Sequence, residues 1–285
     1  MASLRDIRKR IKSVKNTQKI TRAMKLVSAA KLRRAQQAVE ATRPYSDKVL
    51  ETVSAIAKRA ELLGEAQHPL LRQGIAKGAK AELIVMTSDR GLCGGFNTGT
   101  VRRALRFLFD EKANYSEIKV ATVGRKGKEQ LKVKATLAQN FEGVVNAPSY
   151  ARADEIAKSY CERFKNGELD AVFLVYFEFK GGMQVKQLLP IVPMVVDEDL
   201  MEMEYEPSAD AVLEKLLPAH FAMQLFRAFL ETVAAEHLAR MMAMDNATKN
   251  ASDMVDRLTL LYNRARQASI TKELAEIIGG AEAIK

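Results

Sequence analysis

The 285-residue sequence has no tryptophan, two cysteines and three histidines, and it contains no apolar run near the roughly 18 residues of a membrane-spanning helix. Its beginning, MASLRDIRKRIK, has neither an apolar core nor a cleavage pattern, so we expect no secretion signal. Cys93 and Cys161 lie far apart and without the spacing of metal ligands, which favours two free thiols in a reducing compartment. The sequence therefore indicates neither a membrane-spanning protein nor a disulfide-stabilised secreted one.

Patterns of catalytic residues are equally scarce. The histidines at 68, 220 and 237 are scattered, and neither an H-E-x-x-H nor a G-x-S-x-G motif occurs. Cys93 has no evident histidine partner. We therefore expect no catalytic residue, no metal site and no bound cofactor.

One glycine-rich stretch, SDRGLCGGFN at 88–97, stands where a strand would pass into a helix, which is where an α/β domain binds phosphate. Its glycine spacing matches neither G-x-G-x-x-G nor G-x4-G-K-[ST]. The stretch GRKGK at 124–128 fails the same templates. We expect tight turns at both places, and nucleotide binding stays as the alternative that an enzyme would need.

The C-terminal part of the chain, from about Ala219 to Ile278, predicts one very long amphipathic helix. No Pro or Gly interrupts it before Gly279 and Gly280. Some 60 residues would span about 90 Å, so the helix needs a second helix along its apolar seam. The seam residues recur at steps of three or four and are Leu230, Ala234, Leu238, Met241, Met244, Thr248, Ala251, Val255, Leu258, Tyr262 and Ala265.

The only other stretch long enough is the N-terminal one, from Ser3 to about Ala60. Along its apolar seam the step from Val14 to Ile20 is six residues, which should disturb the supercoil. Pro44 should kink the helix or mark a joint. We expect the two terminal helices to pair antiparallel. The predicted N-terminal seam consists of Ile7, Ile11, Val14, Ile20, Met24, Val27, Lys31, Ala35, Ala38, Thr42, Tyr45, Val49, Val53 and Ile56.

Between the helices the hydrophobic period changes. Short apolar runs at 81–87, 119–123, 171–177 and 184–192 predict strands, and 98–112, 126–132 and 152–165 predict helices. This alternation predicts a Rossmann-like α/β domain with a mainly parallel sheet. The expected fold class is therefore α/β with a long antiparallel coiled coil, divided into 1–60, 78–196 and 207–285. Ser208 should cap the last helix, and Pro218 should separate its first turns from the long run.

Charge is concentrated at one end. Residues 1–60 hold sixteen Lys/Arg against four Asp/Glu, a net charge of +12, whereas the whole chain carries +10. Nucleic acid is the alternative partner for such a helix, but no aromatic residue is interleaved for base stacking between Met1 and Pro44. A rod inserted among acidic proteins explains the same charges. The segment 197–206 has six acids in ten residues and is typical of a solvated loop.

Three long motifs, in order along the chain, are similar to those of one known family: IRKRIKSVKNTQKITRAMKLVSAAKLRRAQ, then TSDRGLCGGFN, then RMMAMDNATKNASDMV followed by LTLLYNRARQASITKELAEIIGGAEAI. Together they resemble the γ subunit of bacterial F-type ATP synthase over nearly the whole chain. The resemblance implies a non-catalytic central rotor shaft. It transmits torque between an ion-driven c ring and catalytic β subunits, for ATP synthesis coupled to hydrogen-ion transport.

The resemblance also implies partners and a location. The coiled coil would be inserted into a hexamer of α and β subunits, and the α/β domain would lie beside the ε subunit and on the c ring. We expect one copy per complex, no nucleic acid, no direct membrane insertion, and a peripheral position at the cytoplasmic face of the bacterial membrane. Chloroplast members carry an inserted cysteine pair as a redox switch; Cys93 and Cys161 lie in no such insert, so we expect no thiol regulation.

Eight partner-contact residues follow from the resemblance alone. Met24 matches a position near the acidic β-subunit loop that pushes on the shaft, and the neighbouring Lys25 has the charge that such a loop favours. Glu206 matches a foot residue that contacts the c ring, which makes the acidic run a docking surface. The remaining residues match hydrogen-bond positions to a β-subunit loop (Arg266, Gln267 and Thr271) or form the small apolar tail that suits a bearing (Ile277 and Ile278).

Overall fold

The computed structural model describes residues 3–62, 68–71, 78–179, 181–193, 206 and 208–282. Contacts divide the chain into two compact units, one of Met1–Ala29 with Arg240–Lys285 and one of Ala30–Ala239. The two longest helices are α1 (Leu4–Leu62) and α5 (Ala209–Glu282), and each unit contains a segment of both.

The 30–239 unit is built on a five-stranded sheet with the order β3-β2-β1-β4-β5. β1 (Ala79–Met86) runs parallel to both β2 (Tyr115–Val123) and β4 (Ala171–Glu178). β3 (Leu137–Phe141) extends the parallel part at one edge, and β5 (Gly182–Leu189) closes the other edge antiparallel to β4. The predicted mainly parallel sheet is confirmed.

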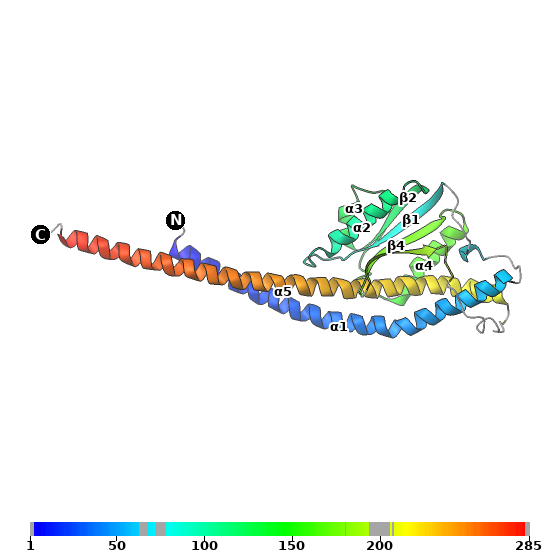
Figure 1. Ribbon diagram of the computed structural model, residues 1–285, viewed down its shortest axis with the longest axis horizontal. Coiled ribbons are helices and arrows are strands. Elements are labelled where there is room, and N and C mark those ends of the chain that lie inside the picture. Colours follow the sequence, from blue (N-terminus) through cyan, green and yellow to red (C-terminus); the bar gives the residue numbers. More distant parts are fainter. Residues whose placement is uncertain are drawn as a thin grey trace. The chain divides into compact units, whose positions relative to one another are not determined.

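Helices cover both faces of this sheet (Figure 1). α2 (Phe96–Asp110) and α3 (Arg125–Leu131) pack on one face, and α4 (Tyr150–Lys165) packs on the other together with segments of α1 and α5. Alternate residues of a strand point to opposite faces, so β1 serves both cores. Leu83 and Val85 join the α2 side, whereas Ile84 and Met86 join the α4 side.

The predicted strands and helices of this unit are all present, but one strand escaped prediction. β3 has the sequence LAQNF and no buried residue, so it lacks the apolar run of the inner strands. Its stability comes from its neighbour, because Thr122 of β2 donates a hydrogen bond to Asn140 Oδ1 at 2.8 Å and the two are paired in register. A short helix, η1 (Pro69–Leu71), follows α1 in the sequence and buries Leu70 and Leu71.

α1 is a continuous helix whose start is fixed by a capping box. The Asp6 amide donates to Ser3 Oγ at 3.2 Å, and the Ser3 amide donates to the Asp6 carboxylate at 3.3 Å. Its half-buried and buried positions repeat every seven residues, which is the period of a coiled coil. The positions that follow this repeat are Ile7, Val14, Thr21, Ser28, Ala35, Thr42, Val49 and Ile56, with Ile11, Gln18, Lys25, Leu32, Val39, Ser46 and Val53 between them, and further half-buried residues such as Met24 and Ala38 flank them.

The seam predicted from apolar residues alone is therefore wrong in part. The six-residue step after Val14 does not exist, because Gln18 and Thr21 occupy the missing seam positions and keep the steps at three and four. Pro44 is also exposed and lies inside an unbroken helix. The exposed residues wrongly assigned to the seam are Ile20, Val27, Lys31 and Tyr45.

α5 begins ten residues earlier than the predicted long run. Ser208 caps it as expected, accepting a hydrogen bond from the Ala211 amide at 3.2 Å. Pro218 does not break the helix: Leu217 and Phe221 are fully buried beside it, and burial of two such side chains, at about 1.5–3 kcal/mol each, offsets the roughly 3 kcal/mol cost of an internal proline. The two glycines near the end do not stop it either, since α5 runs to Glu282. The predicted α5 seam is confirmed as buried or half-buried throughout.

Candidate partner-binding surfaces

In the unit formed by 3–29 and 240–282, α1 and α5 run antiparallel in one constant register. Arg8 donates to the Tyr262 hydroxyl at 2.5 Å, Thr21 and Thr248 share a hydrogen bond of 2.8 Å, and Lys25 binds Asp245 at 2.6 Å. Between the first and last of these contacts the residue numbers rise by 17 on α1 and fall by 17 on α5. An antiparallel pair without insertion or slip has this property.

The outer face of α1 in this unit carries apolar side chains that no seam covers. Ile20, Leu26 and Val27 are 60%, 65% and 57% exposed. They lie among exposed basic residues, including Lys19 and Arg22. An exposed apolar group rimmed by charge is typical of a protein-binding surface.

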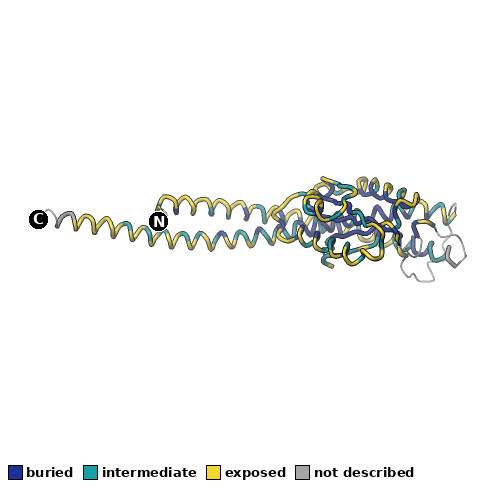
Figure 2. Tube along the Cα trace, turned by 90° about the horizontal axis from the view of Figure 1, so that it is seen from above, coloured by how far each residue is buried: buried dark blue, intermediate teal, exposed yellow. Residues whose placement is uncertain are grey.

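The C-terminal end of α5 has no counterpart on α1. By the register above, Leu4 at the start of α1 lies opposite about residue 266, so the following turns of α5 form a single helix. Figure 2 shows this end of α5 almost wholly exposed. An isolated helix is marginal in water, so this end of α5 is a candidate surface for a partner. Its large exposed apolar side chains are Ile270, Leu274, Ile277 and Ile278.

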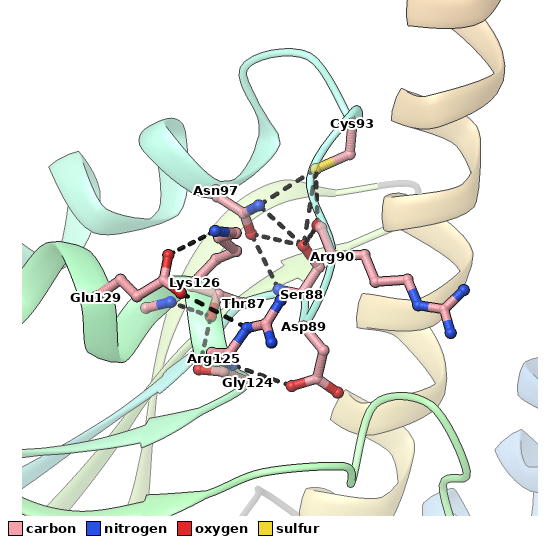
Figure 3. A network of polar contacts seen from close by, with 11 residues as sticks. Thr87, Ser88, Asp89, Arg90, Cys93, Asn97, Gly124, Arg125, Lys126 and Glu129 are labelled. Atoms are coloured by element: carbon pink, nitrogen blue, oxygen red, sulfur yellow. Dashed lines mark hydrogen bonds and ion pairs between the residues drawn. The ribbon is translucent and has the colours of Figure 1, made fainter. Parts of the chain in front are cut away.

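The glycine-rich stretch after β1 forms a closed polar network (Figure 3). The Ser88 amide donates to Asn97 Oδ1 at 2.9 Å, and Asn97 Nδ2 donates to Ser88 Oγ at 2.8 Å and to Cys93 Sγ at 3.2 Å. Asp89 accepts a hydrogen bond from the Arg125 amide at 3.0 Å. These side chains bind one another and tie the turn to the start of α2 and α3, as expected for a packed turn.

Two glycines after β2 are required by close packing. A Cβ at Gly124, whose φ is +93°, would lie 2.3 Å from the Thr87 carbonyl oxygen, and one at Gly127 would lie 2.7 Å from Thr87 Oγ1. The Gly127 amide donates to that hydroxyl at 2.8 Å. The GRKGK stretch therefore brings the β2–α3 turn against the end of β1.

Comparison with known proteins identifies the family. A family model described as ATP synthase matches residues 3–284. The ATP synthase gamma chain of Anaeromyxobacter sp. (strain Fw109-5) is 51% identical over 292 residues, covering 100% of both chains. The chain belongs to the ATP synthase gamma chain family. That of Geobacter metallireducens (strain ATCC 53774 / DSM 7210 / GS-15) is 50% identical over 291 residues, again with 100% of both chains covered.

Solved structures agree with this assignment. The chain is similar to one in the central stalk and c-ring structure of Tetrahymena thermophila mitochondrial ATP synthase, with 25% identity, a TM-score of 0.58, and coverage of 80% of this chain and 99% of that one. A chain of Euglena gracilis mitochondrial ATP synthase shares the fold at 19% identity, with a TM-score of 0.65 and coverage of 99% and 94%. As a member of the γ-chain family, the chain is a central-stalk subunit. None of the described helices is long and apolar enough to cross a membrane.

The residues that the resemblance singled out lie in three places. Met24 and Lys25 are half-buried in the helical pair, where Lys25 is engaged by Asp245. Glu206 is exposed, and the rest of the predicted acidic docking run, 197–205, lies outside the described residues. On the solitary end of α5, Thr271 Oγ1 donates to the Gln267 carbonyl at 2.9 Å. The exposed members of this third group are Arg266, Gln267, Thr271, Ile277 and Ile278.

Prediction from the sequence missed the apolar group at Ile20, Leu26 and Val27. The predicted seam contained almost only apolar residues, so Ile20 and Val27 were placed in it although both are exposed. The signal that identifies them is the unbroken seven-residue repeat through Thr21 and Ser28.

Proposed function

We propose that this chain is the rotor shaft of a bacterial F-type ATP synthase, which transmits torque between an ion-driven c ring and the catalytic β subunits without itself catalysing a reaction. The observation that carries the proposal is the constant antiparallel register of α1 and α5. Through it the N-terminal and C-terminal segments pair as one two-helix rod. Family membership supplies the context of the synthase.

The α1–α5 pair is the part that we assign to the hexamer of α and β subunits. Ile20, Leu26 and Val27 give α1 an apolar outer face among positive charges, which suits an acidic loop presented by a β subunit. Met24 lies next to this face. Lys25 contributes its charge only in part, because Asp245 already binds it at 2.6 Å.

The solitary end of α5 is the part that we assign to the innermost contacts. Arg266 and Gln267 are exposed, so they can exchange hydrogen bonds with a β-subunit loop, and Thr271 extends the same surface. Ile277 and Ile278, 68% and 62% exposed, offer no directional bonds. Apolar contacts have no preferred direction, so they suit a helix end that must rotate inside the surrounding α and β subunits.

In the other unit we assign Glu206 and the acidic run before it to the c ring, and the α/β domain at 78–196 to the ε subunit. The coiled-coil segments 1–60 and 207–285 flank that domain in the sequence. We propose a peripheral place at the cytoplasmic face of the membrane, with one copy per complex.

A reversible cross-link tests the proposal. A cysteine at Gln267, disulfide-bonded to a cysteine in the facing β-subunit loop of the assembled complex, should stop ATP hydrolysis, and reductant should restore it. The native Cys93 and Cys161 are buried and do not compete for the cross-link. The same cysteines kept reduced serve as the control, and unchanged turnover with the cross-link complete would contradict the proposal.

A further inference from the structure

The seam between α1 and α5 changes character along the 3–29 segment. Near the N-terminus it is apolar, with Ile7, Ile11 and Val14. The next four positions of the seven-residue repeat are all polar, Gln18, Thr21, Lys25 and Ser28, with half-buried Met24 beside Lys25. An apolar seam can shift along its axis at little cost because one aliphatic contact replaces another, whereas a polar seam position has few acceptable partners.

Each of the two central polar positions has a specific partner on α5. Thr21 is 8% exposed, and its hydroxyl lies 2.8 Å from that of Thr248. One of the two donates to the other, which leaves the second to donate to a carbonyl of its own helix, Gln18 at 3.1 Å or Met244 at 2.7 Å. The hydroxyls are therefore satisfied in this register.

The charged position is equally specific. Lys25 Nζ lies 2.6 Å from Asp245 Oδ1, and Lys249 Nζ lies 3.3 Å from the other oxygen of the same carboxylate. The hydrogen bond from Lys25 and then that from Lys249 lower the pKa of Asp245, so its charge persists below the usual range. If α1 slid by seven residues along α5, Lys25 would face the level of Leu238 or Ser252 and lose its counter-ion.

We propose that the Thr21–Thr248 and Lys25–Asp245 contacts form a polar key that stops α1 and α5 from sliding past one another and so stiffens the rod. Bending or twisting a two-helix rod requires its helices to shear along their interface, and helices can step past each other by one turn, about 5.4 Å. The benefit of a stiff rod rests on the proposed function, whereas the contacts that form the key do not depend on it. The four residues are positioning residues, and Lys25 acts through the rod as well as through its exposed charge.

Spin-label distances in the full-length chain test the key directly. Labels at Lys9→Cys on α1 and Asn250→Cys on α5 are both at exposed positions, and they are offset along the axis by about ten residues, so sliding changes their distance. A key-free variant combines Thr21→Val, Lys25→Leu, Asp245→Leu and Thr248→Val. A charge-swapped variant combines Lys25→Asp and Asp245→Lys. The control removes an ion pair within one helix, Lys48→Leu with Glu51→Leu.

We expect a narrow distance distribution for the unaltered chain, the control and the charge-swapped variant, and a broadened or two-peaked one for the key-free variant. Apolar replacement of a polar pair often leaves stability unchanged or higher, so the unfolding midpoint should not fall with the loss of register. A key-free distribution as narrow as the original would overturn the proposal, and so would a charge-swapped one as broad as the key-free one. If the key-free variant does not fold, Lys25→Leu with Asp245→Leu replaces it: a broadened distribution supports the key, and one as narrow as the original overturns the proposal.

The assembled complex supplies the second measurement. A bead is attached to the 30–239 unit while turnover is stalled. The angular fluctuations of the bead should be wider with the key-free variant than with the unaltered chain. Equal widths would remove the mechanical role of the key. Failure of the unaltered chain to assemble with α and β subunits would instead overturn the proposed function, and the spin-label result would still decide whether the key exists.

Discussion

At the scale of single residues, the buried ionisable groups of the α/β unit set its response to pH and mutation. Glu82 on β1 is fully buried, and it accepts hydrogen bonds from the Tyr160 hydroxyl and, at 2.8 Å, from Arg163. His220 on α5 is 5% exposed, and its Nδ1 has no partner among the described residues. Glu82 is buried with a cationic partner, whereas His220 is buried with its Nδ1 unpartnered, so we expect the two groups to respond differently to mutation and pH.

Removal of the cation beside Glu82 should be costly. Arg163→Leu leaves a carboxylate buried at 0% exposure without its counter-ion, and we expect a loss of about 3–5 kcal/mol in the free energy of unfolding, measured in urea. The matched control is Arg152→Leu on the same helix, whose ion pair with Glu155 is exposed and should contribute about 0–1 kcal/mol. Similar losses in both variants would contradict this interpretation.

His220 should make the chain less stable in mild acid. Burial, and then the nearby charge of Lys186, lower the pKa of His220 to about 4 from an ordinary value near 6.5. The folded chain therefore resists protonation, and its stability should fall as the pH drops from about 6.5 towards 4, by up to about 1.4 kcal/mol per pH unit. Urea unfolding at several pH values should show a shallower dependence for His220→Leu than for Met223→Leu, a buried neighbour that does not titrate. An equal pH dependence of the unfolding free energy in the two variants would contradict this role of His220.

At the scale of elements, the parts that could be predicted were those in which burial and local pattern agree. β1 and β4 read as strands because both of their faces are buried, and the α5 seam is apolar enough to be followed by period alone. β3 could not be found, because a polar edge strand is defined by its pairing with β2 rather than by its own residues. The α1 seam was misplaced because Thr21 and Ser28 are buried although they are polar, and the partner of Thr21, Thr248, lies 227 positions away on α5.

The candidate partner-binding surfaces were likewise predictable only in part. The exposed end of α5 could be predicted from the resemblance, whereas the outward position of Leu26 and Val27 depends on which polar residues pair across the seam. Such pairing is a tertiary fact that no local pattern contains.

The turn after β2 gives a prediction at this scale. Gly124→Ala should lower the free energy of unfolding by about 2–4 kcal/mol, because the added methyl meets the Thr87 carbonyl in a backbone conformation that favours glycine. Gly91→Ala, in the glycine-rich stretch, meets no atom within 4 Å and should change it by less than about 0.5 kcal/mol. Thermal or urea unfolding distinguishes the two, and an equal effect would show that packing at Thr87 is not the cause.

At the scale of the whole molecule, the thiols should be inert. Cys93 and Cys161 are 2% and 3% exposed, and burial raises the pKa of the Cys161 thiol to about 12, so little thiolate forms near neutral pH. Mild oxidation of the assembled complex should leave ATP hydrolysis unchanged, whether or not reductant follows. A loss of activity that reductant reverses would point to a redox switch.

As the proposed rotor shaft, this chain should turn while the synthase works. A probe fixed through Val133→Cys, a position 85% exposed on the α/β unit, reports that motion in a complex held by its α and β subunits. We expect the probe to rotate in one direction during ATP hydrolysis and to stop when hydrolysis stops. Continued hydrolysis with a stationary probe would contradict it.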